Sequence, residues 1–543
     1  MSGFERNFEG YMLHRLVEAR AEGEPEAPLI LDASGMRTGA WVDGEANRVA
    51  RALLANGIQQ GDRCAVMMEN SADYITVWIG IAKAGAVEVP INTAYHGEIL
   101  RHVLTTADCA LVILDADFLP VLEAVLPDCP TVRLCMVRGG SGARLAGFAG
   151  TVVDFHESLG EDKSSPGLAV GFADPAAIMF TSGTTGPSKG AIISHRQMIG
   201  FGESYAAITS MTAEDTCYNY LPFFHVAGKF NFMAPLIAGG RMVLRQRLSV
   251  SRFWDDIRSH HCTVTTAVGG VCNMLYGQAE TAEDADNPLR LVYAVPIPHE
   301  IKTAFENRFG LTLVEGYGST ECNIVSWTPP EGAPQGACGQ PSPWYDVRIV
   351  DDYDRELPAG EAGEIVVRGR GPYLLTQGYY GMPDATNEVF RNQWFHTGDR
   401  GRLDAEGWLY FIDRMKDAIR RRGENISSYE VEQVVLRHPQ IAEAAAVGVR
   451  SEVQEEELKL VVVRRAKAGL SEAELLQWCA AEMPYFMVPR YIEFRAELPR
   501  TPTQKIRKVE LRAEGIGPDA WDSAAHGFRM TRNGLVQLGG GGR

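Results

Sequence analysis

A loop rich in glycine and hydroxyl side chains follows a short apolar run, and this feature most limits what the chain can fold into. Residues 177–180 are apolar and predict a buried strand, and residues 181–190 read TSGTTGPSKG. Such a loop offers many backbone N–H groups and hydroxyl donors with little bulk, and Lys189 adds a positive charge. Its glycines let the backbone turn sharply and approach a ligand. Because the Gly-Lys-Ser/Thr ending of a Walker loop is absent, the stretch predicts a different kind of polyphosphate loop.

Length and composition predict a globular protein of at least two domains. The chain has 543 residues, of which 45% are hydrophobic and 22% are charged. Its formal net charge of −17 argues against nucleic acid or an anionic membrane surface as the main partner. The ten cysteines form no C-x-x-C pair, no apolar run reaches the ~18–20 residues that span a bilayer, and residues 1–20 lack a signal-peptide core. We therefore expect a cytoplasmic protein with reduced thiols and no integral membrane association.

Helical and strand patterns alternate over residues 40–175 and again over residues 242–295. Residues 71–85, for example, predict a helix capped by Ser71, with a strand on either side. This alternation predicts an α/β fold whose large N-terminal domain contains layered, mostly parallel sheets. Residues 337–413 instead hold short strands joined by Gly, Pro and Asp turns, which predicts a β-rich subdomain of the same domain.

A charged segment marks the predicted domain boundary. Residues 413–421 read DRMKDAIRR and contain six charged side chains. We assign residues 1–413 to the N-terminal domain, 414–515 to a small α+β domain, and 516–543 to a tail expected to be flexible because it ends in LGGGGR. From composition alone, the boundary is equally well a hinge or a plain solvated linker.

Residues 314–322, VEGYGSTEC, place an aromatic ring, hydroxyl groups and a carboxylate close together. Tyr317 can stack on a flat ring, Thr320 can donate to a phosphate, and Glu321 can hold Mg²⁺ directly or through water. A glutamate after a threonine is also common as a helix cap or as one member of an ion pair. The segment alone therefore leaves both a ligand site and a structural role open.

Two later segments carry single charged groups of interest. In residues 394–414, Asp399 lies in the run TGDRG, where a carboxylate can accept both hydroxyls of a ribose, although an aspartate in a β-turn is the simpler interpretation. Residues 498–508, LPRTPTQKIRK, contain Lys505. A lone lysine is normally a solvated surface charge, so neither segment decides a function by itself.

Residues 220–230, YLPFFHVAGKF, form an apolar and aromatic stretch around His225. Without further context, this pattern indicates a core element that packs the histidine. Lys229 is a charge in this otherwise apolar run. We expect it either to be exposed or to point at the carboxylate or the polar tail of a substrate.

In their order along the chain, these five segments resemble the motifs of the adenylate-forming enzymes, which include acyl-CoA synthetases, luciferases and peptide-synthetase adenylation domains. The resemblance covers residues 10–510. The phosphate loop departs from the family form at Pro187 and Ser188, and the last motif has Gln504 where glycine is usual. Residues 92–104, NTAYHGEILRHVL, resemble the carnitine/crotonobetaine-CoA ligase branch.

The resemblance implies a role for each matching residue. The implied catalytic residues are Thr184, His225, Glu321 and Lys505, and Glu321 is also the implied Mg²⁺ ligand. The implied nucleotide and CoA contacts are Thr181, Ser182, Gly183, Thr184, Thr185, Gly186, Lys189, Ala294, Val295, Pro296, Gly316, Tyr317, Gly318, Thr320, Asp399, Arg414, Gly423 and Glu424. Among these, the turn of Ala294, Val295 and Pro296 is an implied adenine contact. The implied acyl pocket, gated by His225, comprises His225, Gly228, Phe230, Val268, Gly269 and Gly316, and Lys416 is the implied hinge.

The same resemblance implies an ATP-dependent acyl-CoA synthetase, an acid–thiol ligase that uses ATP, Mg²⁺ and coenzyme A. The carboxylate of the acid would attack the α-phosphate of ATP and expel pyrophosphate, and CoA would then convert the acyl-AMP to acyl-CoA and AMP. Two anions meet in the first step, so Lys189, Lys505, Mg²⁺ and the loop N–H groups would cancel charge. The C-terminal domain is expected to swing between the steps, with Lys505 serving the first and Gly423 and Glu424 the second.

Three alternatives stay open: an adenylation enzyme that loads a carrier protein in trans, a luciferase-like oxygenase, and a nucleotide-binding protein that lacks the reaction. The few residues after Lys505 do not hold a carrier domain, and the chain ends without a peroxisomal tripeptide. The expected partners are a small carboxylic acid, ATP and CoA, and a homodimer is left open. Small pocket residues favour a medium-chain, aromatic or fused-ring acid, and the sequence does not identify it.

Overall fold

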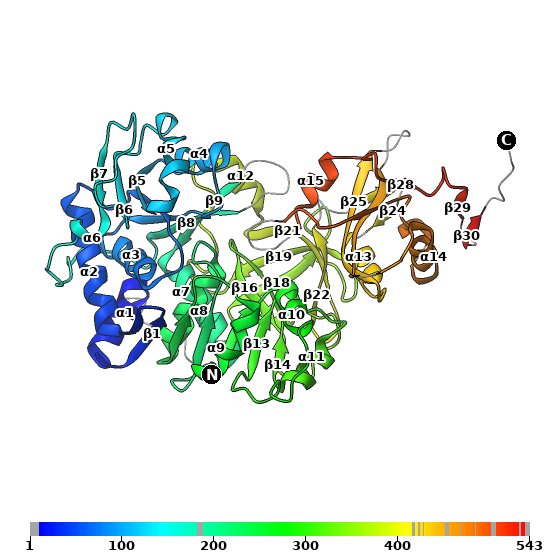
Figure 1. Cartoon of the computed structure of the whole chain (residues 1–543), viewed down its shortest axis with the longest axis horizontal. Helices are drawn as coiled ribbons and strands as arrows, with labels where there is room; N and C mark the ends of the chain where they lie inside the picture. Colours follow the sequence, from blue (N-terminus) through cyan, green and yellow to red (C-terminus); the bar gives the residue numbers. More distant parts are fainter. Residues whose placement is uncertain are drawn as a thin grey trace. The chain divides into compact units, whose positions relative to one another are not determined.

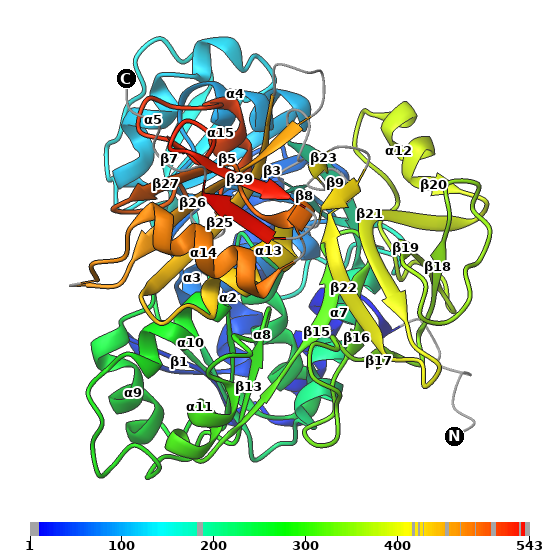
Figure 2. The same ribbon diagram turned by 90° about the vertical axis from the view of Figure 1, so that its right-hand side faces the viewer.

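The chain divides into two compact units. Unit 1 contains residues 1–348, 366–397 and 406–409, and unit 2 contains residues 349–365, 398–405 and 410–543. The computed structural model describes residues 10–181, 188–414, 419–421, 424–426, 428–450, 456–466, 468–483, 485–500, 506–531 and 534–537. Figures 1 and 2 label many of the elements of both units.

The first sheet of unit 1 has seven strands in the order β7-β6-β5-β3-β4-β8-β9. All neighbours pair in parallel except β9, which turns back antiparallel on β8. The strands are nearly continuous apolar runs, as expected for a parallel sheet with both faces buried. They are β3 (Arg63–Met67), β4 (Val87–Pro90), β5 (Cys109–Asp115), β6 (Leu134–Arg138), β7 (Thr151–Asp154), β8 (Pro175–Thr181) and β9 (Lys189–Ser194).

Helices cover both faces of this sheet. Val42 of α2 and Ile75 of α3 share a core with Met179 of β8, whereas Leu100 of α4 shares a second core with Ile178. The predicted helix over residues 71–85 is confirmed as α3, and the Ser71 hydroxyl caps its start. The helices are α1 (Leu13–Gly23), α2 (Gly39–Ala55), α3 (Ala72–Lys83), α4 (Gly97–Thr106), α5 (Leu119–Glu123) and α6 (Phe155–Ser158).

The second sheet of unit 1 also has seven strands, in the order β14-β13-β12-β10-β11-β1-β2. All pairs are parallel except the edge pair β1–β2. The strands are β1 (Pro28–Asp32), β2 (Gly35–Thr38), β10 (Thr216–Asn219), β11 (Arg241–Leu244), β12 (Val264–Ala267), β13 (Leu291–Ala294) and β14 (Thr312–Val314).

Helices α7 and α8 lie between the two sheets (Figure 1). Met198 and Phe232 pack into the core of the first sheet, whereas Tyr205 and Phe230 of the same two helices pack against the second. The other face of the second sheet is covered by α9, α10 and α11. The helices are α7 (His195–Thr209), α8 (Val226–Ala238), α9 (Phe253–Ser259), α10 (Gly269–Tyr276) and α11 (Lys302–Phe309).

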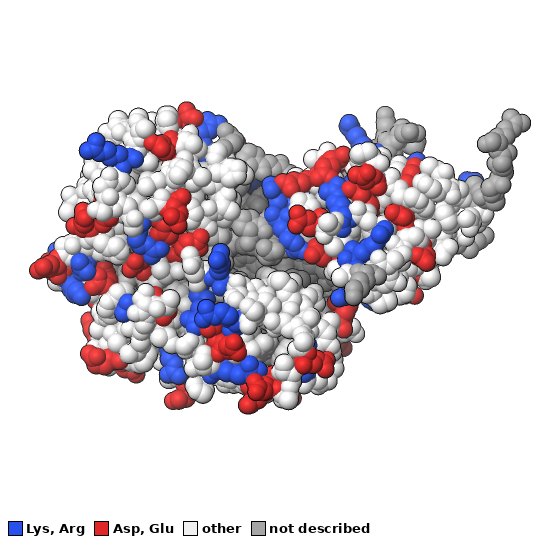
Figure 3. All heavy atoms as spheres, viewed as in Figure 1, with Lys and Arg blue, Asp and Glu red and all other residues white. Residues whose placement is uncertain are grey.

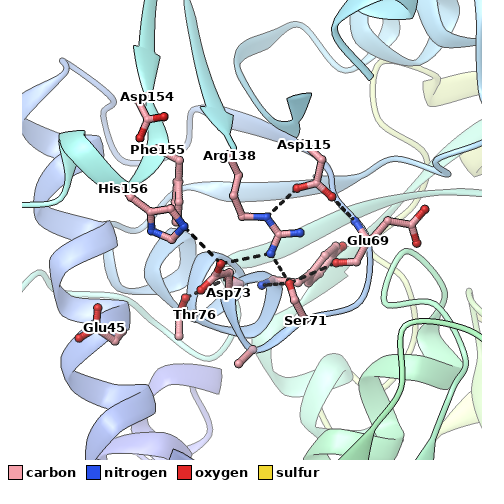
Figure 4. Close-up of polar contacts among 12 residues, drawn as sticks. Glu45, Glu69, Ser71, Asp73, Thr76, Asp115, Arg138, Asp154, Phe155 and His156 are labelled. Atoms are coloured by element: carbon pink, nitrogen blue, oxygen red, sulfur yellow. Dashed lines mark hydrogen bonds and ion pairs between the residues drawn. The ribbon is translucent and has the colours of Figure 1, made fainter. Parts of the chain in front are cut away.

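A cluster of polar side chains joins the carboxyl ends of β5 and β6 to the start of α3 (Figure 4). The Arg138 guanidinium lies 2.6 Å from Asp115 Oδ1 and 3.2 Å from Asp73 Oδ2, and it donates to the Ser71 hydroxyl. Asp115 Oδ2 accepts a hydrogen bond from the Glu69 amide at 2.8 Å. These groups bind one another, so the cluster connects the start of α3 to the ends of β5 and β6.

Residues 315–414 hold short strands, as predicted for most of this stretch. One sheet has the order β15-β16-β17, and the other has the order β18-β19-β21-β20, with β22 also paired to β21. The elements are β15 (Gly316–Ser319), β16 (Asn323–Trp327), β17 (Gln340–Pro341), β18 (Tyr345–Val350), β19 (Gly363–Gly369), α12 (Pro383–Val389), β20 (Phe390–Arg391), β21 (Trp394–Leu403) and β22 (Leu409–Arg414).

The C-terminal part of unit 2 is built around the sheet β25-β26-β27-β28 (Figure 2). Val431 of α13 and Leu475 of α14 pack on one face of it with Leu460 of β26. Residues beyond 515, which we assigned to a tail, include β28, which pairs with β27, and Phe528, which joins this core. The elements are β23 (Ile419–Arg421), β24 (Glu424–Ile426), α13 (Ser428–Leu436), β25 (Ile441–Arg450), β26 (Glu456–Arg464), α14 (Glu472–Glu482), β27 (Tyr491–Arg495), α15 (Lys508–Ala513), β28 (Trp521–Asp522), β29 (Phe528–Thr531) and β30 (Gly534–Gln537).

The observed architecture confirms the predicted class, a mixed α/β protein with parallel sheets and a C-terminal domain that contains β-strands. Acidic and basic side chains are interspersed over the face drawn in Figure 3. All ten cysteines are buried as thiols, and none of them forms a disulfide. Among the residues that the structure describes, no helix is both long and apolar enough to cross a bilayer.

Candidate active site

The predicted phosphate loop leaves the first sheet between β8 and β9. Thr181 ends β8, Lys189 begins β9, and the two residues are partners in the antiparallel register. The hairpin therefore fixes both ends of the loop. The predicted ligands Ser182, Gly183, Thr184, Thr185 and Gly186 lie outside the described residues.

Glu321 joins the second motif to this hairpin. Its Oε1 accepts hydrogen bonds from the Thr181 hydroxyl at 3.1 Å and from the Tyr379 hydroxyl at 3.2 Å. Its backbone carbonyl accepts from Gln197 Nε2 at 3.0 Å and from the Thr376 amide at 2.7 Å. Burial and the nearby carboxylate raise the pKa of Tyr379, so its hydroxyl stays protonated and donates. The half-buried carboxylate is thus held beside the loop.

Further contacts support the basic end of the loop. Lys189 Nζ lies 5.0 Å from the centre of the Tyr379 ring, within the range of a cation–π contact. The His102 Nε2 atom of α4 lies 2.8 Å from the Ser188 carbonyl oxygen. The backbone around Tyr379 pairs with β9 through an isolated bridge to Ala191. These contacts connect α4 and the 376–380 segment to the site.

A second group of predicted residues lies at the ends of β13 and β14. The Glu315 carboxylate accepts from the Ile297 amide at 3.2 Å and lies 3.4 Å from His299 Nε2. It therefore ties the predicted adenine turn, residues 294–296, to residues 316–317 of β15. Burial raises the pKa of Glu315 to about 8 and lowers the pKa of His299.

Within this group, Ala294 and Tyr317 are buried, whereas Val295, Pro296 and Gly318 are exposed. A Cβ atom at Gly318 would lie 2.1 Å from the Asn323 carbonyl oxygen, so the turn between β15 and β16 excludes any larger residue. Thr320 is half-buried beside that turn.

The residues predicted for the acyl pocket lie around the start of α8 and α10. His225 directly precedes α8, Val268 directly precedes α10, and the Phe230 ring packs 4.8 Å from the ring of Tyr205. At three of these glycines an added Cβ atom would lie too close to a backbone carbonyl oxygen. The distance would be 2.5 Å from Gly228 to Pro222, 2.9 Å from Gly269 to Pro296, and 2.7 Å from Gly316 to Ser326. Close backbone packing therefore accounts for these glycines, and their part in a pocket stays a prediction.

The expectation for Lys229 was wrong. Its side chain is fully buried, and Nζ lies 2.6 and 2.8 Å from the two carboxylate oxygens of Glu88 on β4. The Tyr74 hydroxyl donates to the same carboxylate at 2.9 Å, and the Trp78 ring centre lies 4.0 Å from Nζ. Burial lowers the pKa of Lys229 and raises that of Glu88. Lys229 thus fastens α8 to the first sheet and does not face a substrate.

The remaining predicted residues belong to unit 2. Asp399 lies in β21 and is buried, Arg414 ends β22, and Glu424 begins β24. Gly398, with φ of +69°, precedes Asp399 in a backbone conformation that favours glycine. The predicted hinge Lys416, the predicted CoA-facing Gly423 and the predicted catalytic Lys505 lie outside the described residues.

Sequence reasoning missed several residues that hold the site together. Gln197, Thr376 and Tyr379 all bind Glu321, His102 supports the loop, and Glu315 orders the predicted adenine turn. Each contacts a motif more than ten positions away in sequence, so no spacing pattern marks it.

Family models match most of the chain. The model described as AMP-binding enzyme matches residues 17–380, and the model described as AMP-binding enzyme C-terminal domain matches residues 430–505. The chain belongs to the AMP-binding enzyme family. A crotonobetaine/carnitine–CoA ligase of Salmonella typhi is 33% identical over 484 residues, which cover 87% of this chain and 92% of the relative.

Solved structures of this family resemble the chain over most of its length. The ATP-bound MatB from Rhodopseudomonas palustris is 28% identical with a TM-score of 0.83, and the match covers 92% of this chain and 98% of that one. The o-succinylbenzoate CoA synthetase (MenE) from Bacillus subtilis, in complex with the acyl-adenylate intermediate OSB-AMP, is 25% identical with a TM-score of 0.80. That match covers 92% of this chain and 97% of MenE.

The recognition, the fold class and the enzyme class predicted from sequence are therefore confirmed. This AMP-binding enzyme is an ATP-dependent acyl-CoA synthetase, an acid–thiol ligase. The individual site residues stay predictions, supported by the contacts described above.

Proposed function

We propose that this synthetase activates its acid at the junction of Thr181, Lys189 and Glu321, at the mouth of the β8–β9 hairpin. The observation that carries this proposal is the hydrogen bond from Thr181 to Glu321, because it brings together the phosphate loop and the segment 314–322. A cation and a carboxylate at one edge, next to a loop rich in N–H groups, suit a metal-bound triphosphate.

In this proposal, Lys189 and the loop bind the phosphates, and residues 294–296 with Tyr317 enclose the adenine. The residues beside Glu321 are compatible with Mg²⁺, because one carboxylate together with substrate phosphates is a usual donor set for this ion. When bound, Mg²⁺ would supply charge neutralisation at the phosphates. Glu321 holds its carboxylate in place through Thr181 and Tyr379.

The C-terminal domain, residues 414–515, would serve the two half-reactions with different residues. In the first, the carboxylate oxygen of the acid forms a bond to the α-phosphorus of ATP, and the bond to pyrophosphate breaks. Lys505 would approach these anions from the C-terminal domain. In the second, the sulfur of CoA forms a bond to the acyl carbon, and AMP leaves. Asp399 and Arg414 would hold the ribose, and rotation about Lys416 would then bring Gly423 and Glu424 to the thiol path.

A panel of carboxylic acids tests this proposal. Each acid is incubated with ATP, Mg²⁺ and CoA, and nucleotide and thioester products are identified by mass. The panel should include quaternary-ammonium acids, because the Salmonella typhi relative is named for crotonobetaine and carnitine, and medium-chain, aromatic and fused-ring acids. We expect AMP, pyrophosphate and an acyl-CoA with at least one acid. Production of ADP in place of AMP would contradict the proposal, and acyl-AMP that reacts only with an added carrier protein would identify the acceptor as a carrier.

A further inference from the structure

Tyr379 contacts two oppositely charged groups of the proposed site at once. Its hydroxyl donates to Glu321 Oε1 at 3.2 Å, and the Lys189 ammonium lies over its ring at 5.0 Å. The side chain is 91% buried, with an exposed fraction of 9%. Its backbone amide donates to the Thr386 hydroxyl at 2.9 Å. The ring is therefore held from several directions and is not free to turn away.

The two charges do not pair with each other. Among the described residues, Lys189 forms no ion pair, although Glu321 approaches the same aromatic side chain. Opposite charges that both line a partly buried site attract strongly. A direct pair would neutralise both groups and remove the cation from the phosphates and the carboxylate from the metal. Something must hold the two groups apart before the substrates arrive.

We propose that Tyr379 is a positioning residue that holds Lys189 and Glu321 apart in the open arrangement required by a metal-bound triphosphate. Its ring attracts the ammonium through the cation–π interaction, and its hydroxyl orients the carboxylate by donating to Oε1. This inference rests on the proposed function, because it assumes that the site binds ATP.

The adjacent Tyr380 provides a matched control. Segment 376–380 pairs with β9, so consecutive side chains point to opposite sides. Tyr380 faces a different set of partners: its hydroxyl lies 3.4 Å from Asp108 Oδ2, and Arg63 lies over its ring at 5.6 Å. Tyr380→Phe therefore removes a hydroxyl from the same segment without touching Lys189 or Glu321.

The test measures equilibrium binding of ATP by calorimetry, once with Mg²⁺ and once with EDTA. Tyr379→Phe keeps the ring and loses the hydroxyl, so we expect roughly tenfold weaker binding with Mg²⁺ and unchanged binding in EDTA. Tyr379→Leu loses both contacts, so Lys189 collapses onto Glu321 and binding weakens under both conditions. Tyr380→Phe should match the wild type throughout.

A rescue variant separates positioning from folding. In Tyr379→Leu/Glu321→Gln, the lysine has no carboxylate to pair with, so ATP binding in EDTA should return to the wild-type value. A structural defect at position 379 would not be repaired by a change at Glu321. The inference is overturned if the second substitution fails to restore binding, or if Tyr379→Phe binds ATP with Mg²⁺ as the wild type does. Absence of ATP binding by the wild type would instead overturn the proposed function.

Discussion

The Thr181 hydroxyl donates to Glu321 Oε1 at 3.1 Å, across 140 positions of sequence. Thr181 lies at the end of a strand in the first sheet, and Glu321 follows β15, which begins just after the last strand of the second sheet. This bond therefore fixes the carboxylate at the mouth of the phosphate loop. The position of Glu321 predicts that its charge matters for adenylation and not for folding.

Glu321→Gln should lose most of its Mg²⁺-dependent adenylation while it keeps its thermal unfolding temperature. The amide retains the shape and can still accept from Thr181 and Tyr379, but it has no charge to offer a metal. We expect the rate of pyrophosphate release to fall on the order of 100-fold. Glu306→Gln, which changes a charge on α11 in the same unit, is the control. Activity within a few-fold of wild type at saturating Mg²⁺ would show that Glu321 does not bind the metal.

Breaking the buried pair between Lys229 and Glu88 should destabilise the protein strongly. Lys229→Met leaves an unpaired carboxylate in the core, and breaking one member of a buried pair costs about 3–5 kcal/mol of unfolding free energy. The double variant Lys229→Met/Glu88→Met removes both charges and should lose much less than the single change. Urea unfolding followed by tryptophan fluorescence measures both, because Trp78 lies 4.0 Å from the ammonium. A double variant that loses as much as the single change would contradict this account, because removing the unpaired carboxylate should recover stability.

Glu315 predicts a pH dependence of stability. Burial raises its pKa to about 8, above the ordinary value of an unfolded glutamate, so the fold favours the protonated form. The stability that this group contributes is fully present below pH ~4.5 and is lost as pH rises through about 8, by at most ~1.4 kcal/mol per pH unit.

Glu315→Gln mimics the protonated carboxyl and should remove this dependence. Thermal unfolding of both proteins at pH 6, 7, 8 and 9 checks it. The unfolding temperature of the variant should rise relative to that of the wild type as pH rises towards 8. The difference between the two unfolding temperatures should level off above that pH. Curves that stay parallel over this range would show that Glu315 does not titrate there.

Much of the fold follows from sequence, because local patterns determine it. The apolar run at residues 177–180 is the core of β8, and the Ser71 cap begins α3, as predicted. The prediction for Lys229 was wrong because its partner Glu88 lies 141 positions away. The sequence near Lys229 does not indicate a buried carboxylate. Tyr379 and Glu315 escaped notice for the same reason, since their roles arise only when distant strands meet.

Lys505→Ala should separate the two half-reactions. If the C-terminal domain alternates, Lys505 touches the reacting groups only during adenylation, so pyrophosphate release should fall roughly 100-fold or more. The same variant, supplied with synthetic acyl-AMP and CoA, should form thioester at nearly the wild-type rate. Gly423→Leu should do the reverse, because it fills the predicted thiol path. If Lys505→Ala slowed both half-reactions equally, the proposed movement of the C-terminal domain between them would be contradicted.

The most direct test of the central claim follows oxygen from the acid into the nucleotide. The acid selected by the substrate panel is labelled with ¹⁸O in both carboxylate oxygens and is incubated with ATP, Mg²⁺ and CoA. If the carboxylate attacks the α-phosphorus and CoA then displaces AMP, each AMP formed carries one ¹⁸O atom, and the pyrophosphate carries none. Unlabelled AMP, or label recovered in inorganic phosphate, would contradict activation through an acyl-adenylate.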